Sequence, residues 1–405
     1  MLEVRRVKPR PNTISTTNRK TAPAQTQKRT GAGMVYTRQS RGFVSGLRPT
    51  QLASPSNSKG ARQCPPQVSD WAEVRTYDSM GREENMRRSF LIAPVLAVLL
   101  VVGLPAAGAA KVTLVVGSDH EECPKADFTR IQDAVNAAAP GSTIVVCPGI
   151  YREMVTIATN ELKIIGKDGP DDVVVEGKPE NPHDAQMAGF FLHMVSGVLI
   201  QGFTVRGFHE SDILLEGANG NIIRDNRITE SAHDGIQLNH SSNNLIEDNV
   251  SFDNDAGLPA RAFTDACGVL LRLGSAHNTI RHNEFFGNAF GIFVGPTSNA
   301  NVISENDSHD NRRDGIRNRL NAGTLIDRNE VDHNRVSSLG PGRGISVEAS
   351  SDITVIQNEA FDNVVDLFWD GAGTNNQFRD NECDTSQPSG FCESRGGKGR
   401  VSEVL

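Results

Sequence analysis

Aromatic residues and lysine are scarce in this chain. Phe, Trp and Tyr together make up 5% of its 405 residues, and no lysine occurs between residues 179 and 397. The missing lysine argues against a lysine acting as a catalytic base in that stretch. Glycine and asparagine are abundant instead, which is typical of short strands joined by tight turns.

Excess positive charge is also absent from most of the chain. Residues 111–405 contain 24 Lys and Arg against 43 Asp and Glu. Affinity for phosphate backbones needs a basic surface, so we expect no nucleic-acid partner. The acidic balance gives no general attraction for acidic polysaccharides, although local basic strips could still bind them.

Long hydrophobic runs are limited to residues 90–104. This run follows the basic start Met86-Arg87-Arg88-Ser89 and precedes the small residues 106–110. It is short for about 30 Å of hydrocarbon, contains Pro94 and is followed by Pro105, so we interpret residues 86–110 as a signal peptide cleaved near Ala110. The mature chain is then secreted, without a membrane span. Residues 1–85 are predicted to be a disordered extension that precedes the true start at Met86.

The six cysteines are few for a secreted protein of this length. Export permits disulfides, and the positions of the cysteines predict the pairs Cys123–Cys147 and Cys383–Cys392, near the two ends of the repeated region. Cys267 is predicted to be a buried small apolar residue.

A six-residue phrase that closes on asparagine recurs along the chain. Five clear copies and two degenerate ones end at Asn226, Asn249, Asn283, Asn306, Asn329, Asn358 and Asn381. The steps between them are 23 residues, with two longer steps of 34 and 29. Such a period predicts a solenoid whose coils share one core. We expect the asparagines to occupy left-handed turns and to form a ladder of side-chain hydrogen bonds.

The regions outside the repeats suggest a cap and a tail. Residues 111–141 are predicted to form an N-terminal cap, with an amphipathic helix over 127–139 that Asp127 begins. Residues 142–395 are predicted to form the coils, and residues 396–405 a frayed tail. An end cap is expected because an open solenoid would expose apolar side chains and strand edges.

A second strand in each coil opens near a glycine, and its alternation separates two sets of side chains. The inward set is Ile236, Leu238, Val269, Leu271, Ile292, Val294, Ile316, Ile345 and Val347. The outward set is Gln237, Asn239, Leu270, Arg272, Phe293, Arg317, Arg319, Ser346 and Glu348. Asn318 breaks the inward pattern, which leaves the register of its coil open.

These phrases resemble the repeats of the pectin-lyase-like superfamily of right-handed parallel β-helix proteins. The stretch 140–153, with the helical segment before it, is similar to the start of pectin methylesterases and other secreted β-helix proteins. The resemblance covers roughly residues 111–395. It implies an all-β, single-stranded right-handed parallel β-helix with a short N-terminal capping helix.

The two longer steps predict loops around 254–266 and 335–343 that leave the same corner, three coils apart. They could wall a cleft whose floor is Arg272, Phe293, Arg317 and Arg319, with Arg312, Arg313 and Asp314 at its lip. Members of the superfamily bind sugar chains over this face, so the resemblance implies a polysaccharide or cell-surface glycan as partner.

His233 and Asp234 are the sharpest candidates for catalysis. A uronate epimerase or lyase needs a base and a cation, which His233, supported by Asp234, and Arg317 or Arg272 would supply. The pair resembles the end of the Asp-Pro-His-Asp signature of alginate C5-epimerases, which residues 181–184 (Asn-Pro-His-Asp) match more closely. The structural alternative is a polar turn before a strand. Complete methylesterase and polygalacturonase motifs are missing, and lysis by an arginine base stays open.

No cofactor follows from the sequence, but calcium is an option. Acidic turns at 253–255 and 307–310 offer oxygen ligands without a loop of fixed calcium spacing. His282, His309 and His333 fall at different offsets in successive coils, so no transition-metal site is expected.

Three functions follow from these patterns. The first is a secreted protein that binds carbohydrate or a cell-surface partner along the outward strip. The second is a uronan C5-epimerase or lyase. The third is a periplasmic factor for metalloenzyme maturation or a scaffold, which the lack of Cys, Met and His clusters disfavours.

Overall fold

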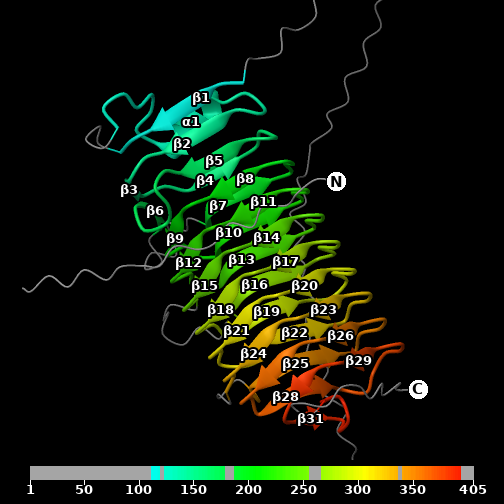
Figure 1. The fold of residues 1–405 in the computed structure, drawn as a ribbon. Coiled ribbons are helices and arrows are strands. Elements are labelled where there is room, and N and C mark those ends of the chain that lie inside the picture. Colours follow the sequence, from blue (N-terminus) through cyan, green and yellow to red (C-terminus); the bar gives the residue numbers. More distant parts are fainter. Residues whose placement is uncertain (1–110, 119–122, 178–186, 255–265, 336–339, 394–405) are drawn as a thin grey trace, which may run out of the picture. The chain divides into compact units, whose positions relative to one another are not determined.

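The computed structural model describes residues 111–118, 123–177, 187–254, 266–335 and 340–393. All of them belong to one unit, which extends from Ala97 to Leu405. They form one short helix and 31 strands, which lie in three parallel sheets (Figure 1). From β2 onward, successive strands visit the three sheets in turn, so each coil adds one strand to each sheet.

We name the sheets A, B and C in the order in which a coil visits them. Sheet A contains β1 (Thr113–Val116), β2 (Thr143–Val146), β5 (Lys163–Gly166), β8 (Leu199–Gln201), β11 (Ile222–Arg224), β14 (Leu245–Glu247), β17 (Thr279–Arg281), β20 (Val302–Ser304), β23 (Leu325–Asp327), β26 (Thr354–Ile356) and β29 (Gln377–Arg379). Sheet B contains β3 (Gly149–Tyr151), β6 (Val173–Glu176), β9 (Thr204–Arg206), β12 (Arg227–Thr229), β15 (Val250–Phe252), β18 (Glu284–Phe286), β21 (Asp307–His309), β24 (Glu330–Asp332), β27 (Glu359–Phe361) and β30 (Glu382–Cys383). Sheet C contains β4 (Val155–Ile157), β7 (Ala188–His193), β10 (Ser211–Glu216), β13 (Asp234–Asn239), β16 (Cys267–Arg272), β19 (Phe290–Val294), β22 (Ile316–Arg319), β25 (Arg343–Glu348), β28 (Val365–Trp369) and β31 (Ser386–Gln387).

Equivalent positions of the repeat are hydrogen-bonded neighbours. In sheet A, Ile223 pairs with Ile246, which pairs with Ile280, and Ile303 and Ile326 follow in the same column. All five side chains are fully buried in one continuous core. The predicted all-β parallel β-helix, with about 23 residues in each regular coil, is therefore confirmed.

The left-handed turn residue is not the asparagine, as the sequence suggested, but the residue before it. Asp225, Asp248 and His282 have φ of 52°, 55° and 54°, and each is followed by a closing asparagine. The left-handed residue turns the chain outward, and the next side chain then points into the corner. There Asn226 donates to the carbonyl of Ile200 at 3.2 Å, a bond that a side chain on the outside could not make.

The asparagine ladder is present, and it is one of three. The predicted ladder between sheets A and B runs from Asn226 through Asn249, Asn283, Asn306, Asn329 and Asn358 to Asn381, with amide-to-amide distances of 2.9–3.0 Å. A second ladder, between sheets C and A, links Asn221, Asn244, Asn278 and Asn301. The third, between sheets B and C, includes Asn254, Asn288, Asn311, Asn334 and Asn363. All three corners are therefore fixed by the same chemistry.

The glycine near the start of β13, β16, β19, β22 and β25 is required by a close approach at the third corner. A Cβ on Gly291 would lie 2.0 Å from Oγ of Ser308 and 2.6 Å from the carbonyl of Gly315. No side chain fits there, because real atoms do not approach so closely. This requirement explains why a glycine occurs near the start of these strands in the sequence.

The N-terminal helix is shorter than predicted, and the expected cap residue is wrong. Helix α1 spans Ile131–Ala137, and Asp127 instead accepts a bond from the N–H of Val115 at 2.9 Å. The buried carboxylate of Glu153 accepts from the N–H groups of Ile131 and Gln132, at 2.8 and 3.1 Å, and so takes the role of the cap. Within the described residues, no helix is long and apolar enough to cross a membrane.

Both predicted disulfides are present, Cys123–Cys147 and Cys383–Cys392. At the C-terminal end of the coils the ring of Phe391 stacks on Phe378, with a centroid distance of 4.0 Å. The bond between Cys383 and Cys392 closes the segment that carries Phe391. An apolar ring therefore covers the last layer of the core, as the cap argument requires.

The predicted inward set is buried without exception, and Asn318 is buried with it. Register is kept on both sides, because Asn318 pairs with Val294 and Val347 and points inward between them. Neither atom of its amide has a hydrogen-bond partner among the described residues. The strand thus holds its register at the cost of an unsatisfied polar group.

Replacing Asn318 by leucine is expected to stabilise the protein by about 1–3 kcal/mol, since the amide loses its hydration without compensation. Leucine keeps the branched outline of asparagine, and Leu271 occupies the same column two strands away. Urea unfolding monitored by circular dichroism measures the change. The matched control, Val294→Asn, should lower stability by a similar amount. A loss of stability in Asn318→Leu would show that this amide is satisfied in solution.

Candidate functional site

The outer face of sheet C carries the residues predicted to form a binding strip. Strand register stacks one outward position from each strand: Phe191, Leu214, Gln237, Leu270, Phe293, Arg317, Ser346 and Phe368. The strip is less exposed than the sequence suggested, because Gln237 and Ser346 are fully buried and Leu270 is nearly so. Cys267, Leu270, Ala289 and Phe290 form an apolar cluster separate from the main core. This face is thus a packed second layer with polar clusters in it.

His233 and Asp234 form a tight pair at the start of β13. Nδ1 of His233 lies 2.6 Å from Oδ2 of Asp234, whose Oδ1 accepts from the N–H of Cys267 at 2.9 Å. Asp234 is fully buried, and His233 is partly buried beside it. A carboxylate on Nδ1 fixes the orientation of an imidazole and the tautomer that it adopts. The pair is therefore built as a positioned His–Asp unit.

Gln237 connects this pair to Arg272. Its amide satisfies its neighbours when the nitrogen faces Asp234, 3.1 Å from Oδ2, and the oxygen accepts from Nη2 of Arg272 at 2.6 Å. Nε of Arg272 also donates to Asn239 at 2.9 Å. A chain of hydrogen bonds thus runs from the imidazole through a carboxylate and an amide to a guanidinium.

The pKa of His233 is raised from its ordinary value. Burial alone would lower this pKa, but the charge of Asp234, the hydrogen bond to it and the charge of Glu210 together outweigh burial. Arg272 acts in the opposite direction. The imidazole is therefore a stronger base than a histidine in water.

Arg317 belongs to a second cluster, centred on Glu348. Glu348 accepts from Nη2 of Arg317 at 2.7 Å and from Nη1 of Arg343 at 2.6 Å, and Arg319 lies 3.7 Å away. Burial alone would raise the pKa of Glu348, but Arg317 and Arg343 lower it overall. One carboxylate thus holds three guanidinium groups on the same face.

Aromatic rings surround this second cluster. The guanidinium of Arg317 lies 5.2 Å from the ring centroid of Phe290 and 5.3 Å from that of Phe293. The guanidinium of Arg343 lies 3.5 Å from the centroid of Phe368. Cation–π contacts of this kind hold arginines flat against a surface.

The residues predicted at the lip have structural contacts of their own. Asp314 is buried, accepts from Oγ of Ser346 at 2.7 Å, and has a pKa that burial raises. Arg312 donates to the carbonyl of Asn254 at 3.4 Å, and Arg313 lies over the ring of Phe290 at 4.4 Å. Asp314 is thus a support for β25 rather than an exposed ligand.

The structure brings His233 and Asp234 together with Arg272, not with Arg317. Strand β22, which carries Arg317, is three strands from β13 in sheet C. At about 4.8 Å per strand this separation is about 14 Å. Of the two arginines that the sequence offered as the cation, Arg272 therefore lies in the network of His233 and Asp234, and Arg317 lies in the cluster of Glu348.

Sequence reasoning missed Phe290 and Arg343, which occupy a third outward position on their sheet C strands. The residues before the glycines, including Phe290 and Arg343, begin these strands and lie on the outer face with Asp234 and Cys267. Continuing the alternation backwards past each glycine would have found them. Phe290 contacts the guanidinium groups of Arg313 and Arg317, and Arg343 donates to Glu348.

Several sequence candidates lie outside the described residues. They are the Asn-Pro-His-Asp segment at 181–184, most of the two predicted loops, and Asp255 of one predicted calcium turn. The predicted walls of the cleft, which these two loops would form, therefore also lie mostly outside the described residues. The two longer steps of the repeat connect sheet B to sheet C, one from β15 to β16 and the other from β24 to β25. Strands β16 and β25 are three strands apart in sheet C.

Coils of three short strands, asparagine-filled corners and one sheet covered by an outer polar layer define a parallel β-helix protein with a candidate site on sheet C. The chain belongs to the family described as right handed beta helix region, which matches residues 173–305 and 267–403. Among curated protein sequences, none matches the chain.

Solved structures of similar fold include several proteins. Alginate lyase from Paenibacillus sp. str. FPU-7 is 14% identical, covers 68% of this chain and 97% of its own, and has a TM-score of 0.56. A mutant of DFA-IIIase from Arthrobacter chlorophenolicus, in complex with DFA-III, is 13% identical over 66% of this chain and 76% of its own, with a TM-score of 0.48. The A-module of the mannuronan C-5 epimerase AlgE4 from Azotobacter vinelandii is 16% identical over 63% and 82%, with a TM-score of 0.39. These likenesses concern the fold.

Proposed function

We propose that this protein is secreted and binds an acidic polysaccharide along the outer face of sheet C. The observation that carries the proposal is the group of guanidinium groups and phenyl rings that β19, β22, β25 and β28 present on that face, in contact with one another. Planar guanidinium groups bind carboxylates in two-point contacts, and rings pack against the apolar faces of sugars. The signal-like segment 86–110 and the two disulfides support secretion.

The exposed arginines are the ones that would meet the ligand. Arg319 and Arg272 have side chains 48% and 37% exposed, while Arg317 is only 12% exposed. Glu348 holds part of the charge of this cluster in place, so the guanidinium groups are oriented before any glycan arrives. Such preorganisation reduces the entropy lost on binding.

Catalysis on a uronan is a second candidate, and the network of His233, Asp234, Gln237 and Arg272 favours it. Neutral His233 would take the C5 proton of a uronate, and the electron pair left on carbon would move into the adjacent carboxylate. Arg272 would stabilise the resulting dianionic, enolate-like group. Return of a proton to the opposite face gives the epimer, whereas loss of the 4-linked sugar gives an unsaturated end.

Binding is tested with the full-length protein on alginate and pectate, with and without calcium. Calorimetry should show binding to at least one polymer, and Arg319→Ala should weaken it about tenfold, as expected for a charged hydrogen bond of about 1.4 kcal/mol. Arg328→Ala is the matched control, because Arg328 is also about half exposed and ion-paired but lies next to sheet A. No binding to either polymer, or equal losses in both variants, would refute the proposal. Absorbance of unsaturated ends and the epimer ratio by NMR, in the same samples, decide between binding alone and catalysis.

A further inference from the structure

The outer face of sheet B carries a separate group of side chains with metal-binding chemistry. Asp307 and His309 lie two residues apart on β21, so both point to the same side of the sheet. Glu284 is the register partner of Asp307 on the neighbouring strand β18. Among the described residues, these three form a group in which one ligand atom of each lies within 4.8 Å of the others.

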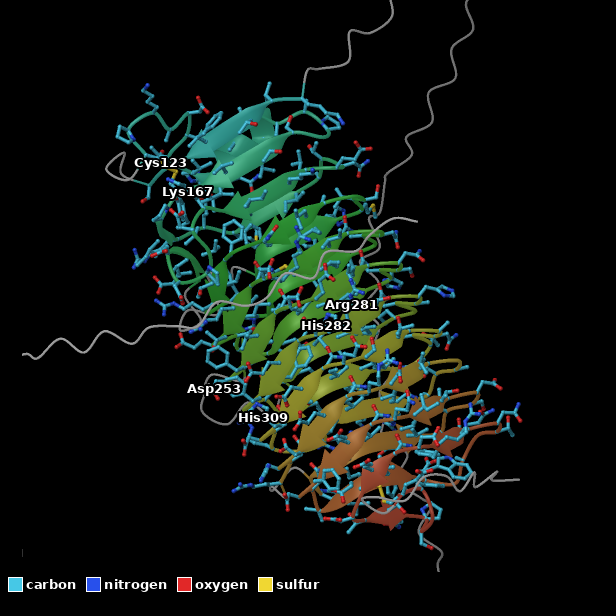
Figure 2. All side chains as sticks on the ribbon, viewed as in Figure 1. Cys123, Lys167, Asp253, Arg281, His282 and His309 are labelled. Carbon is cyan, nitrogen blue, oxygen red and sulfur yellow. A yellow bond between two sulfur atoms is a disulfide. The ribbon has the colours of Figure 1, made fainter. Side chains whose placement is uncertain are left out.

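The imidazole of His309, which Figure 2 labels, is held in a fixed orientation. The ring of His309 stacks on Phe286 at 5.2 Å and 10°, and Phe286 stacks in the same way on Phe252 at 4.9 Å. Nδ1 of His309 lies 3.1 Å from the carboxylate of Asp310, while Nε2 lies 3.4 Å from Oε1 of Glu284. A carboxylate behind one ring nitrogen is the support that metal-binding histidines have in proteins, and it leaves the other nitrogen for the metal.

The charge of this face also favours a bound cation. Register stacks Glu284, Asp307, Glu330, Glu359 and Glu382 in one column of five neighbouring strands. Like charges directly opposite one another on adjacent strands repel. Within the described part of the chain, no lysine or arginine forms an ion pair with Asp307. A divalent ion beside Asp307 would neutralise the negative charge at the end of this column that Glu284 and Asp307 form.

We propose that Glu284, Asp307 and His309 bind one divalent transition-metal ion, for which zinc is the best match. Two carboxylates and one imidazole are a donor set that zinc accepts, with a fourth position left for water. Calcium instead takes six to eight oxygen ligands and does not select an imidazole. Glu284 is about half exposed, so its side chain can adjust to the zinc–oxygen distance of about 2 Å. The ion would cross-link two neighbouring coils, β18 and β21.

The proposed site differs from the sequence-based expectation that no transition-metal site exists. That expectation compared histidines of successive coils, and His282 and His333 indeed contact other carboxylates, of Glu305 and Asp332. The site uses one histidine with carboxylates of the strand it lies on and of the neighbouring strand. It does not depend on the glycan face of sheet C.

Zinc binding by the full-length protein tests the proposal. Calorimetric titration with ZnCl2 should contain one event per chain that is weakened at least about 100-fold in Asp307→Asn and in His309→Phe, beyond the range for loss of a supporting partner. Phenylalanine keeps the ring stack on Phe286 but removes the ligand, so the fold is preserved. Asp310→Asn should weaken the same event about tenfold. Zinc should raise the melting temperature of the wild type but not of the first two variants.

His333→Ala is the control, since His333 is also partly exposed and 2.8 Å from a carboxylate but belongs to no such three-donor group in the described part of the chain. It should bind zinc as the wild type does. Identical zinc isotherms for the wild type, Asp307→Asn and His309→Phe would overturn the site. Tighter binding of CaCl2 than of ZnCl2, retained in His309→Phe, would overturn the choice of metal.

Discussion

Replacing Asn306 by alanine is expected to lower the free energy of unfolding by about 3–5 kcal/mol. The amide of Asn306 donates to Asn329 and to the carbonyl of Ile280, both at 2.9 Å, and accepts from the side-chain and backbone N–H groups of Asn283 at 3.0 and 3.1 Å. Alanine removes these four buried hydrogen bonds, while Asn329 keeps its bond from the backbone N–H of Asn306 and Asn283 keeps its bonds to the carbonyls of Ile246 and Arg281. Equilibrium unfolding in urea, monitored by far-UV circular dichroism, measures the loss.

Asn299→Ala is the matched control for this experiment. Asn299 is exposed, lies outside the three ladders, and its side chain accepts a bond from the N–H of Ala322 at 2.9 Å. Its replacement should cost less than about 1 kcal/mol. Equal losses at both positions would mean that the ladder adds nothing beyond ordinary surface hydrogen bonding, and the account of the corners would fail.

Replacing His233 by glutamine is expected to reduce turnover of a uronan substrate by about 10²–10⁴-fold, the usual contribution of a general base. The base must be neutral, so the wild-type rate should rise with pH and level off above the raised pKa of His233. That midpoint lies above the ordinary value of 6.5. Epimer ratio and absorbance of unsaturated ends, recorded from about pH 5 to 9, provide the profile.

His240→Gln is the control for turnover. His240 is exposed, lies just after the same strand, and contacts Glu216 at 3.3 Å rather than Asp234 or Gln237. It should keep the wild-type rate and pH profile. Turnover that survives His233→Gln would remove His233 from the mechanism and leave the binding proposal intact.

The same pKa shift has a consequence for stability. Because the pKa of folded His233 is raised by Asp234, its contribution is fully present below the unfolded value of about 6.5. The contribution is lost as pH rises through the folded pKa. In His233→Gln this part of the pH dependence of unfolding should disappear.

The fold could be predicted because each coil repeats one pattern. Ile223, Ile246 and Ile280 share a column only if the chain returns to the same place after each phrase. The turn geometry could not be predicted in the same way. Left-handed residues are as varied as Asp225, His282 and Arg328, so their identity carries little signal. The asparagine after each one carries the signal, because its side chain has specific partners.

The candidate site was predictable only in part. His233 and Asp234 are adjacent in sequence, which made their contact easy to foresee. The choice between Arg272 and Arg317 depends on which guanidinium reaches Gln237 and which reaches Glu348. These contacts cross strands that are up to 35 residues apart in sequence. Alternation gives the face on which a side chain lies, but not its rotamer or its partner.

Because the coils share the same corners, the fold can gain or lose whole coils but not parts of a coil. Removing a single residue from a coil would shift every later left-handed residue and asparagine away from its corner. Removing a complete coil, such as residues 301–323, would instead place Thr324 where Asn301 had been and would let β23 pair with β17 in the register that β20 had. Duplication or loss of a full turn therefore preserves the architecture, and shorter edits damage it.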